Sequence, residues 1–189
     1  MSRSLRQVGE FHFIRRLRRL AASPSPRVLR GMGDDAAIVA APVQGRCLLL
    51  TGDSVIEGVH FTSATSPYRI GWKAMARAVS DIAAMGGRPL YALVMASFPP
   101  NLSLDRALAI QRGIHAAARC FGVDLVGGDT ARHPWRIHLA VTVVGEGDRR
   151  NLVSRCGARP GDLLCVCLLY TSDAADDLLC VDLGGRRII

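Results

Sequence analysis

Four aspartates occupy positions from which they could bind a divalent cation together. Asp35, Asp53 and Asp129 each lie beside glycines in short motifs, and Asp81 lies near the end of an expected helix over Pro67–Met85. Two carboxylates about 4 Å apart repel each other by roughly 4 kcal/mol at an effective dielectric constant of about 20. Divalent cations would offset this repulsion, and an all-oxygen ligand set favours magnesium over zinc. The sequence therefore raises the hypothesis of a magnesium site.

The helix that carries Asp81 is expected to have one buried face. Its apolar residues recur at intervals of three and four, so Asp81 lies beside that face, where an unpaired carboxylate is costly. An ordinary pair with Arg77, one turn earlier, is the alternative to a metal. The apolar residues are Ala74, Ala78, Ile82 and Met85.

The segment Val55–Phe61 is too apolar for a loop that only faces solvent, and it contains an acid, a glycine and His60. Such a loop beside a strand is a reasonable place for substrate contacts. A purely structural role for His60 is the other interpretation.

The hydrophobic periodicity predicts an α+β fold, in which helices cover a mixed or antiparallel sheet. Ser103 is the expected N-cap of one helix, and Pro89–Phe98 is expected to be buried on both faces. Asp53 is expected at a strand end. The predicted helices are Glu10–Ala22, Pro67–Met85 and Leu104–Phe121, and the predicted strands are Ala36–Ala41, Arg46–Thr51, Pro89–Phe98, Val123–Val126, Ile137–Gly145 and Leu163–Val166.

Composition excludes several classes of protein. The chain of 189 residues is 49% hydrophobic but has no apolar run long enough for a transmembrane span or a signal-peptide core, so we expect a cytoplasmic globular protein that does not associate with membranes. The net charge of +8 comes almost entirely from arginine, which we interpret as a coding bias and not as a nucleic-acid surface. No P-loop or Rossmann glycine motif is present, so phosphate binding would depend on metals.

Six motifs, in their order, resemble the thiamine-monophosphate kinases, which belong to a superfamily with aminoimidazole ribonucleotide synthetase and selenophosphate synthetase. Together they extend from Gly9 to about Val166. They are Gly9-Glu10-Phe11, Gly31–Ala37, Thr51–Phe61, Ser80–Gly86, Val126–Thr130 and Ser154–Asp162.

The resemblance implies the N-terminal domain of the aminoimidazole ribonucleotide synthetase-like fold and phosphorylation of thiamine phosphate by ATP to thiamine diphosphate, with Mg²⁺. It also implies a homodimer formed through this domain. Gly52 departs from the usual threonine or serine, which removes a possible hydroxyl ligand. The implied magnesium ligands are Asp35, Thr51, Asp53, Asp81 and Asp129; the implied ATP contacts are Gly128 and Arg155; and the implied thiamine-phosphate contact is His60. The resemblance identifies no catalytic residue.

We expect the chain to divide into four segments. Residues 1–30 form an N-terminal helix and linker, and 31–148 form the domain that binds ATP and magnesium. Residues 149–166 form a connector and the first strand of a truncated C-terminal domain. Residues 167–189 resemble a translated sequencing adapter, so we exclude them from fold reasoning and expect the fragment to be inactive alone.

Two other functions stay open on the sequence. One is a different ATP-dependent enzyme of the superfamily, such as a selenophosphate synthetase, although Met1–Gly31 lacks the cysteine expected there. The other is a non-catalytic module for nucleotide binding or dimerisation.

Overall fold

The computed structural model describes residues 10–20 and 25–163. One compact unit extends to Arg155. Its elements are α2 (Glu10–Leu20), β1 (Val28–Arg30), β2 (Ala37–Ala40), β3 (Arg46–Ile56), α3 (Pro67–Ala84), β4 (Arg88–Phe98), α4 (Leu104–Phe121), β5 (Asp124–Arg132) and β6 (His138–Asp148).

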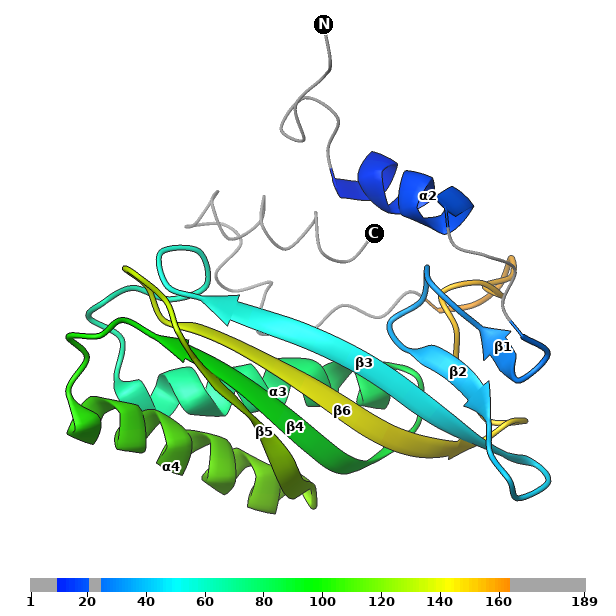
Figure 1. Cartoon of the computed structure of the whole chain (residues 1–189). Helices are drawn as coiled ribbons and strands as arrows, with labels where there is room; N and C mark the ends of the chain where they lie inside the picture. The colour runs from blue at the N-terminus through cyan, green and yellow to red at the C-terminus, as the bar shows by residue number, and fades with distance from the viewer. Residues whose placement is uncertain (1–9, 21–24, 164–189) are drawn as a thin grey trace, which may run out of the picture. The chain divides into compact units, whose positions relative to one another are not determined.

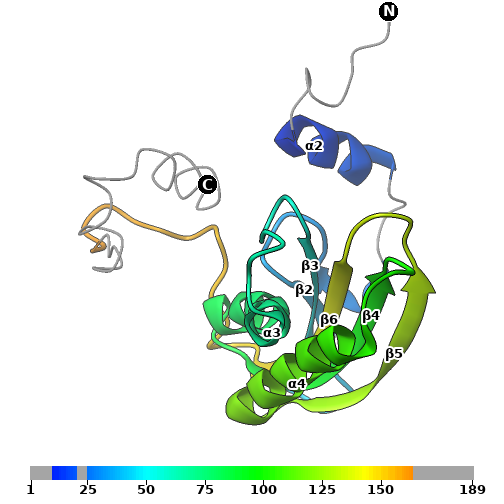
Figure 2. The same ribbon diagram turned by 90° about the vertical axis from the view of Figure 1, so that its left-hand side faces the viewer.

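The strands form one mixed sheet in the order β1-β2-β3-β6-β4-β5. All neighbouring pairs are antiparallel except β4 and β5. Figures 1 and 2 show α3 and α4 side by side on one face of this sheet. The predicted α+β fold, with helices over a mixed sheet, is confirmed.

Alternation along the strands separates a buried face from an open one. On β3, Leu49, Thr51 and Val55 are at most 9% exposed and face the helices. Residues between them point the other way, so Leu50 is 37% exposed; on β4, Tyr91 is 48% and Leu93 is 42% exposed. We call this second surface the open face, formed by Leu50, Tyr91, Leu93, Thr142 and Val144.

Two glycines allow α3 and α4 to pack closely. A Cβ at Gly71 would lie 1.9 Å from the carbonyl oxygen of Ile110, and one at Gly113 would lie 2.0 Å from that of Tyr68. No side chain fits at either position. This contact fixes the spacing of α3 and α4, while the hydrogen bond between Thr51 and Asp81 connects α3 to β3.

The helix ends follow local sequence chemistry. Pro67 occupies the first turn of α3, where its missing N–H costs nothing. The side chain of Ser103 accepts a hydrogen bond from the Arg106 amide, which confirms its predicted role as the N-cap of α4. Gly122 ends α4 in a left-handed conformation, φ 67°.

Two sequence-based expectations were wrong, and one strand was missed. Strand β3 does not end at Thr51 but continues to Ile56, so Asp53 lies within the strand. Strand β4 is buried on one face only, because no element among the described residues covers Tyr91 and Leu93. Strand β1 was not predicted, since three residues carry too little periodicity to recognise.

The second unit begins at Cys156, and its described part ends at Leu163. It contains a turn in which the Arg159 amide donates to the carboxylate of Asp162 at 2.8 Å. The predicted strand Leu163–Val166 lies almost wholly outside the described residues, and the adapter-like segment 167–189 lies wholly outside them. No helix of the described residues is long and apolar enough to cross a membrane.

Candidate functional site

Three of the four predicted acidic ligands lie near one another at the C-terminal half of α3. Thr51 of β3 faces the helices and donates a hydrogen bond from its Oγ1 to Oδ2 of Asp81 at 2.7 Å. Asp53, two residues further along β3, lies on the same face, and both Asp53 and Asp35 act electrostatically on Asp81. We call Asp35, Asp53 and Asp81 the acidic cluster.

Arg77 pairs with Asp53 and not with Asp81. Its Nε donates to Oδ2 of Asp53 at 2.8 Å, and its Nη2 donates to Oδ1 at 3.0 Å. The expected alternative, an ordinary pair between Arg77 and Asp81 on one helix, is therefore wrong. The guanidinium instead connects α3 to the sheet in a bidentate geometry.

The two neighbouring aspartates of the β1–β2 turn have different environments. The side chain of Asp34 is only 2% exposed; it accepts hydrogen bonds from Arg30 and from the amides of Asp35 and Arg155. Asp34 therefore organises the turn. The Asp35 side chain, 25% exposed, pairs with Arg155 through Nε at 3.0 Å and Nη2 at 2.5 Å.

Burial raises the pKa of Asp81 above its ordinary value, and the negative charges of Asp53 and Asp35 add to this rise. The hydrogen bond from Thr51 and the charge of Arg77 act in the opposite direction. A carboxylate that is costly to ionise in this position would be stabilised by an added cation.

The acidic cluster and the hydroxyl of Thr51 together fit a magnesium ion in chemistry, because all of their donor atoms are oxygens. In the conformation shown, however, no three acidic, histidine or cysteine side chains of the described residues are placed to hold a metal. The contacts explain this, since Arg77 and Arg155 already occupy the carboxylates of Asp53 and Asp35.

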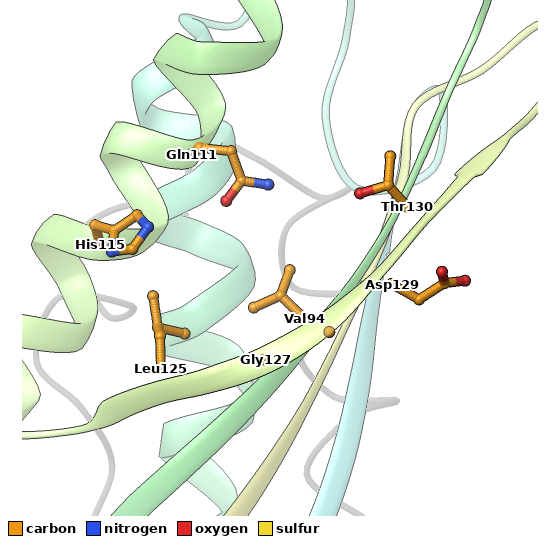
Figure 3. Close-up of a pocket in the computed structure, with 8 residues that line it drawn as sticks. Val94, Gln111, His115, Leu125, Gly127, Asp129 and Thr130 are labelled. Atoms are coloured by element: carbon orange, nitrogen blue, oxygen red, sulfur yellow. The ribbon is translucent and has the colours of Figure 1, made fainter.

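Asp129 does not join the acidic cluster within one chain. Pairing places Asp53, Val141, Val94 and Gly128 in one row across β3, β6, β4 and β5, so Gly128 lies three strand spacings, about 14 Å, from Asp53. Successive side chains of a strand point to opposite faces, so the side chain of Asp129, the next residue, points away from the face that carries Asp53. Figure 3 shows its carboxylate on the side of β5 away from Gln111 and His115.

Gly128 has a structural requirement of its own. A Cβ at this position would lie 1.9 Å from the carbonyl oxygen of Val94, and the residue has φ 157°. The glycine therefore permits the close approach of β5 to β4, whether or not its amide also contacts phosphate.

A polar cavity of about 410 Å³ lies between α4 and β5 (Figure 3). Gln111 and His115 of α4 face Thr130 of β5 across it. Gly128 also lines the cavity. The sequence did not single out the two α4 residues. The only available signal was that they lie one turn apart on the helix.

His60 lies in a tight loop after β3 and not in the acidic cluster. Its Nδ1 accepts a hydrogen bond from the Ile56 amide at 3.0 Å, and Lys73 of α3 donates to its carbonyl oxygen. Gly58, at φ 79°, and the buried Phe61 close the loop. Ile56 is three residues beyond Asp53, which separates the loop from Asp53 by about 10 Å along the strand.

The family model for "AIR synthase related protein, N-terminal domain" matches residues 33–147. The chain belongs to this family. The matched segment contains β2 to β5, α3, α4 and all of β6 except Asp148, and hence Asp35, Asp53, Asp81 and Asp129. Arg155 lies outside it.

Within this family, the chain is similar to thiamine-monophosphate kinases. It is 37% identical over 146 residues to the enzyme of Bacillus subtilis (strain 168), covering 77% of this chain and 45% of that one. It is 35% identical over 160 residues to that of Aquifex aeolicus (strain VF5), covering 84% and 48%. The chain thus spans about half the length of the curated relatives it matches.

A solved structure gives the same picture of the fold. The structure described as "AaThiL complexed with AMPPCP and TMP" superposes with a TM-score of 0.75 at 33% identity, covering 84% of this chain and 48% of that one. The family domain described above is therefore shared with a relative that binds these two compounds.

Proposed function

We propose that the chain is part of a thiamine-monophosphate kinase, which phosphorylates thiamine phosphate with ATP to give thiamine diphosphate. Two kinds of observation support the proposal. The curated relatives at 35 and 37% identity carry this activity in their names, and a relative with the same fold was solved with AMPPCP and TMP. The observation in this chain that carries the proposal is the acidic cluster, in which Asp81 lies half-buried beside two other carboxylates.

In this proposal Asp35, Thr51, Asp53 and Asp81 hold magnesium at one end of α3. Bound magnesium would neutralise the charge that develops on the phosphates, and phosphoryl transfer requires little more than this and correct positioning. Thr51 orients Asp81 through its hydrogen bond. Asp53 and Asp35 must exchange an arginine partner for the metal, since both are ion-paired in the structure.

The remaining predicted roles stay proposals. Arg155 would leave Asp35 to contact ATP, and the backbone of Gly128 would contact a phosphate from β5. His60 would contact thiamine phosphate from its loop at the end of β3, about 10 Å along the strand from Asp53. Gly52 lies on the open face beside Thr142, so a hydroxyl at this position would point away from Asp81.

We further propose that the chain forms a homodimer through the open face. Tyr91 and Leu93 of this face are 48% and 42% exposed, and Val126 of the neighbouring strand β5 is 58% exposed. An apolar cavity lies between these three residues. A second copy would cover this surface and remove it from water. Asp129 points to the same side of the sheet, so its carboxylate would then lie at the interface between copies.

A cytoplasmic location without membrane or nucleic-acid partners also remains part of the proposal. So does the division into a linker at 1–30, an ATP- and magnesium-binding domain at 31–148, a connector with the first strand of a second domain at 149–166, and an adapter-like segment at 167–189.

The test is an assay of the full-length protein for ATP-dependent formation of thiamine diphosphate, with selenide and an aminoimidazole precursor as competing substrates. We expect turnover of thiamine phosphate only. Since the chain spans half of its relatives, calorimetry with AMPPCP and Mg²⁺ on this chain is the companion experiment. Binding of AMPPCP by this chain, without turnover of thiamine phosphate by the full-length protein, would favour a nucleotide-binding module. Turnover of selenide would overturn the proposal.

A further inference from the structure

Both oxygens of the Asp53 carboxylate are already engaged. Oδ2 accepts from Arg77 Nε at 2.8 Å, and Oδ1 accepts from Arg77 Nη2 at 3.0 Å and from the Ser54 amide at 2.8 Å. The side chain of Arg77 is 27% exposed and that of Asp53 is 24% exposed. A cation that approaches Asp53 would therefore have to displace the partly buried guanidinium of Arg77.

Arg77 is held in this position at some cost. Its Nη1 is buried and has no hydrogen-bond partner within the described part of the chain. An unpaired buried donor is unfavourable, so the pairing with Asp53 must compensate for it. Arg77 does not pair with Asp81, whose Oδ2 accepts a hydrogen bond from Thr51.

We propose that Arg77 is a positioning residue that competes with a divalent cation for Asp53 and thereby lowers the metal affinity of the acidic cluster. The proposal rests on the magnesium site proposed above. A metal ion and a bidentate guanidinium use the same carboxylate lone pairs, and their positive charges repel, so one must leave when the other binds. Arg155 opposes binding at Asp35 less strongly, because its side chain is 46% exposed and exchanges with water more easily.

The test is Mn²⁺ binding to the purified chain, without nucleotide, measured by titration calorimetry and by the electron paramagnetic resonance signal of free Mn²⁺. Arg77→Met should bind Mn²⁺ about tenfold more tightly than the wild type, a gain of about 1.4 kcal/mol. Arg69→Met is the matched control, because it removes an exposed arginine from the same helix. We expect it to change the affinity by less than about twofold.

A double-mutant cycle locates the effect at Asp53. Asp53→Asn should weaken binding by about twofold in the wild type, where Arg77 already occupies the carboxylate. In the Arg77→Met background the same change should remove the tenfold gain. A general loss of structure would weaken binding in every variant and could not produce this pattern.

Equal affinities for Arg77→Met and Arg69→Met, or a gain that persists in the Asp53→Asn double variant, would overturn the role of Arg77 and leave the metal site in place. If neither the wild type nor Arg77→Met binds Mn²⁺, both proposals are wrong. Should Arg77→Met fail to fold by circular dichroism, Arg77→Lys replaces it. A lysine cannot form the fork, so we expect about threefold tighter binding, and an unchanged affinity contradicts the proposal.

Discussion

Replacing Asp81 with asparagine should make the metal-free chain more stable. The ionised carboxylate is half-buried and repelled by Asp53 and Asp35, although arginines partly neutralise both neighbours. The asparagine side chain keeps an oxygen that can accept the hydrogen bond from Thr51. The substitution mainly removes the cost of desolvating a charge. We therefore expect the free energy of unfolding to rise by about 1 kcal/mol, which corresponds to an increase of roughly 2–4 °C in melting temperature.

The pH dependence of this gain has a definite sign. Because the folded state raises the pKa of Asp81, the folded chain binds this proton more readily than the unfolded chain. The ionised residue therefore costs stability above its folded pKa, and this cost disappears as the pH falls below the unfolded value of 3.8. The stability gained by Asp81→Asn should therefore decrease as the pH falls.

Thermal unfolding followed by circular dichroism in EDTA measures this difference at about pH 7 and about pH 4.5. Asp124→Asn, at an exposed position on β5, is the control for a change in net charge. A lower melting temperature for Asp81→Asn at the higher pH, or a gain that grows on acidification, would refute the reasoning about burial and repulsion.

Further changes test other parts of the structure. Thr51→Val should destabilise the chain by about 1–3 kcal/mol in urea unfolding, because Asp81 loses its buried hydrogen bond; an unchanged midpoint would contradict the contact. Gly71→Ala should cost about 2 kcal/mol or more in the same assay, because its Cβ would meet the backbone of α4. Gly128→Ala should also lower the melting temperature, so nucleotide binding must be compared with stability in that variant, and a stable variant would contradict the close approach to β4. Leu93→Arg should shift the chain from dimer to monomer in analytical ultracentrifugation; if the dimer persists, it does not form through the open face.

The sequence predicted the elements better than their contacts. The periodicity of α3 identified its buried face, and Ala74, Ala78, Ile82 and Met85 are all at most 1% exposed. Strand β4 was misread because a continuous apolar run is equally consistent with burial on both faces and with an open face that awaits a partner.

The site was predicted in part, for a reason visible in the sheet order. Asp35, Asp53 and Asp81 come together because β2 and β3 are neighbours and α3 packs on β3. Asp129 lies on β5, which is separated from β3 and Asp53 by β6 and β4. No local sequence pattern predicts this strand order. The pairing of Arg77 with Asp53 could not be predicted either, because the spacing along the helix indicated Asp81 as the nearer partner.

The most direct test is a calorimetric titration of the chain with AMPPCP in the presence and absence of Mg²⁺, for the wild type and Asp81→Asn. If the acidic cluster holds the metal that binds the nucleotide phosphates, the wild type binds AMPPCP only with Mg²⁺, and Asp81→Asn weakens that binding at least about tenfold. Magnesium-dependent binding of equal strength in both proteins would show that the metal is held elsewhere.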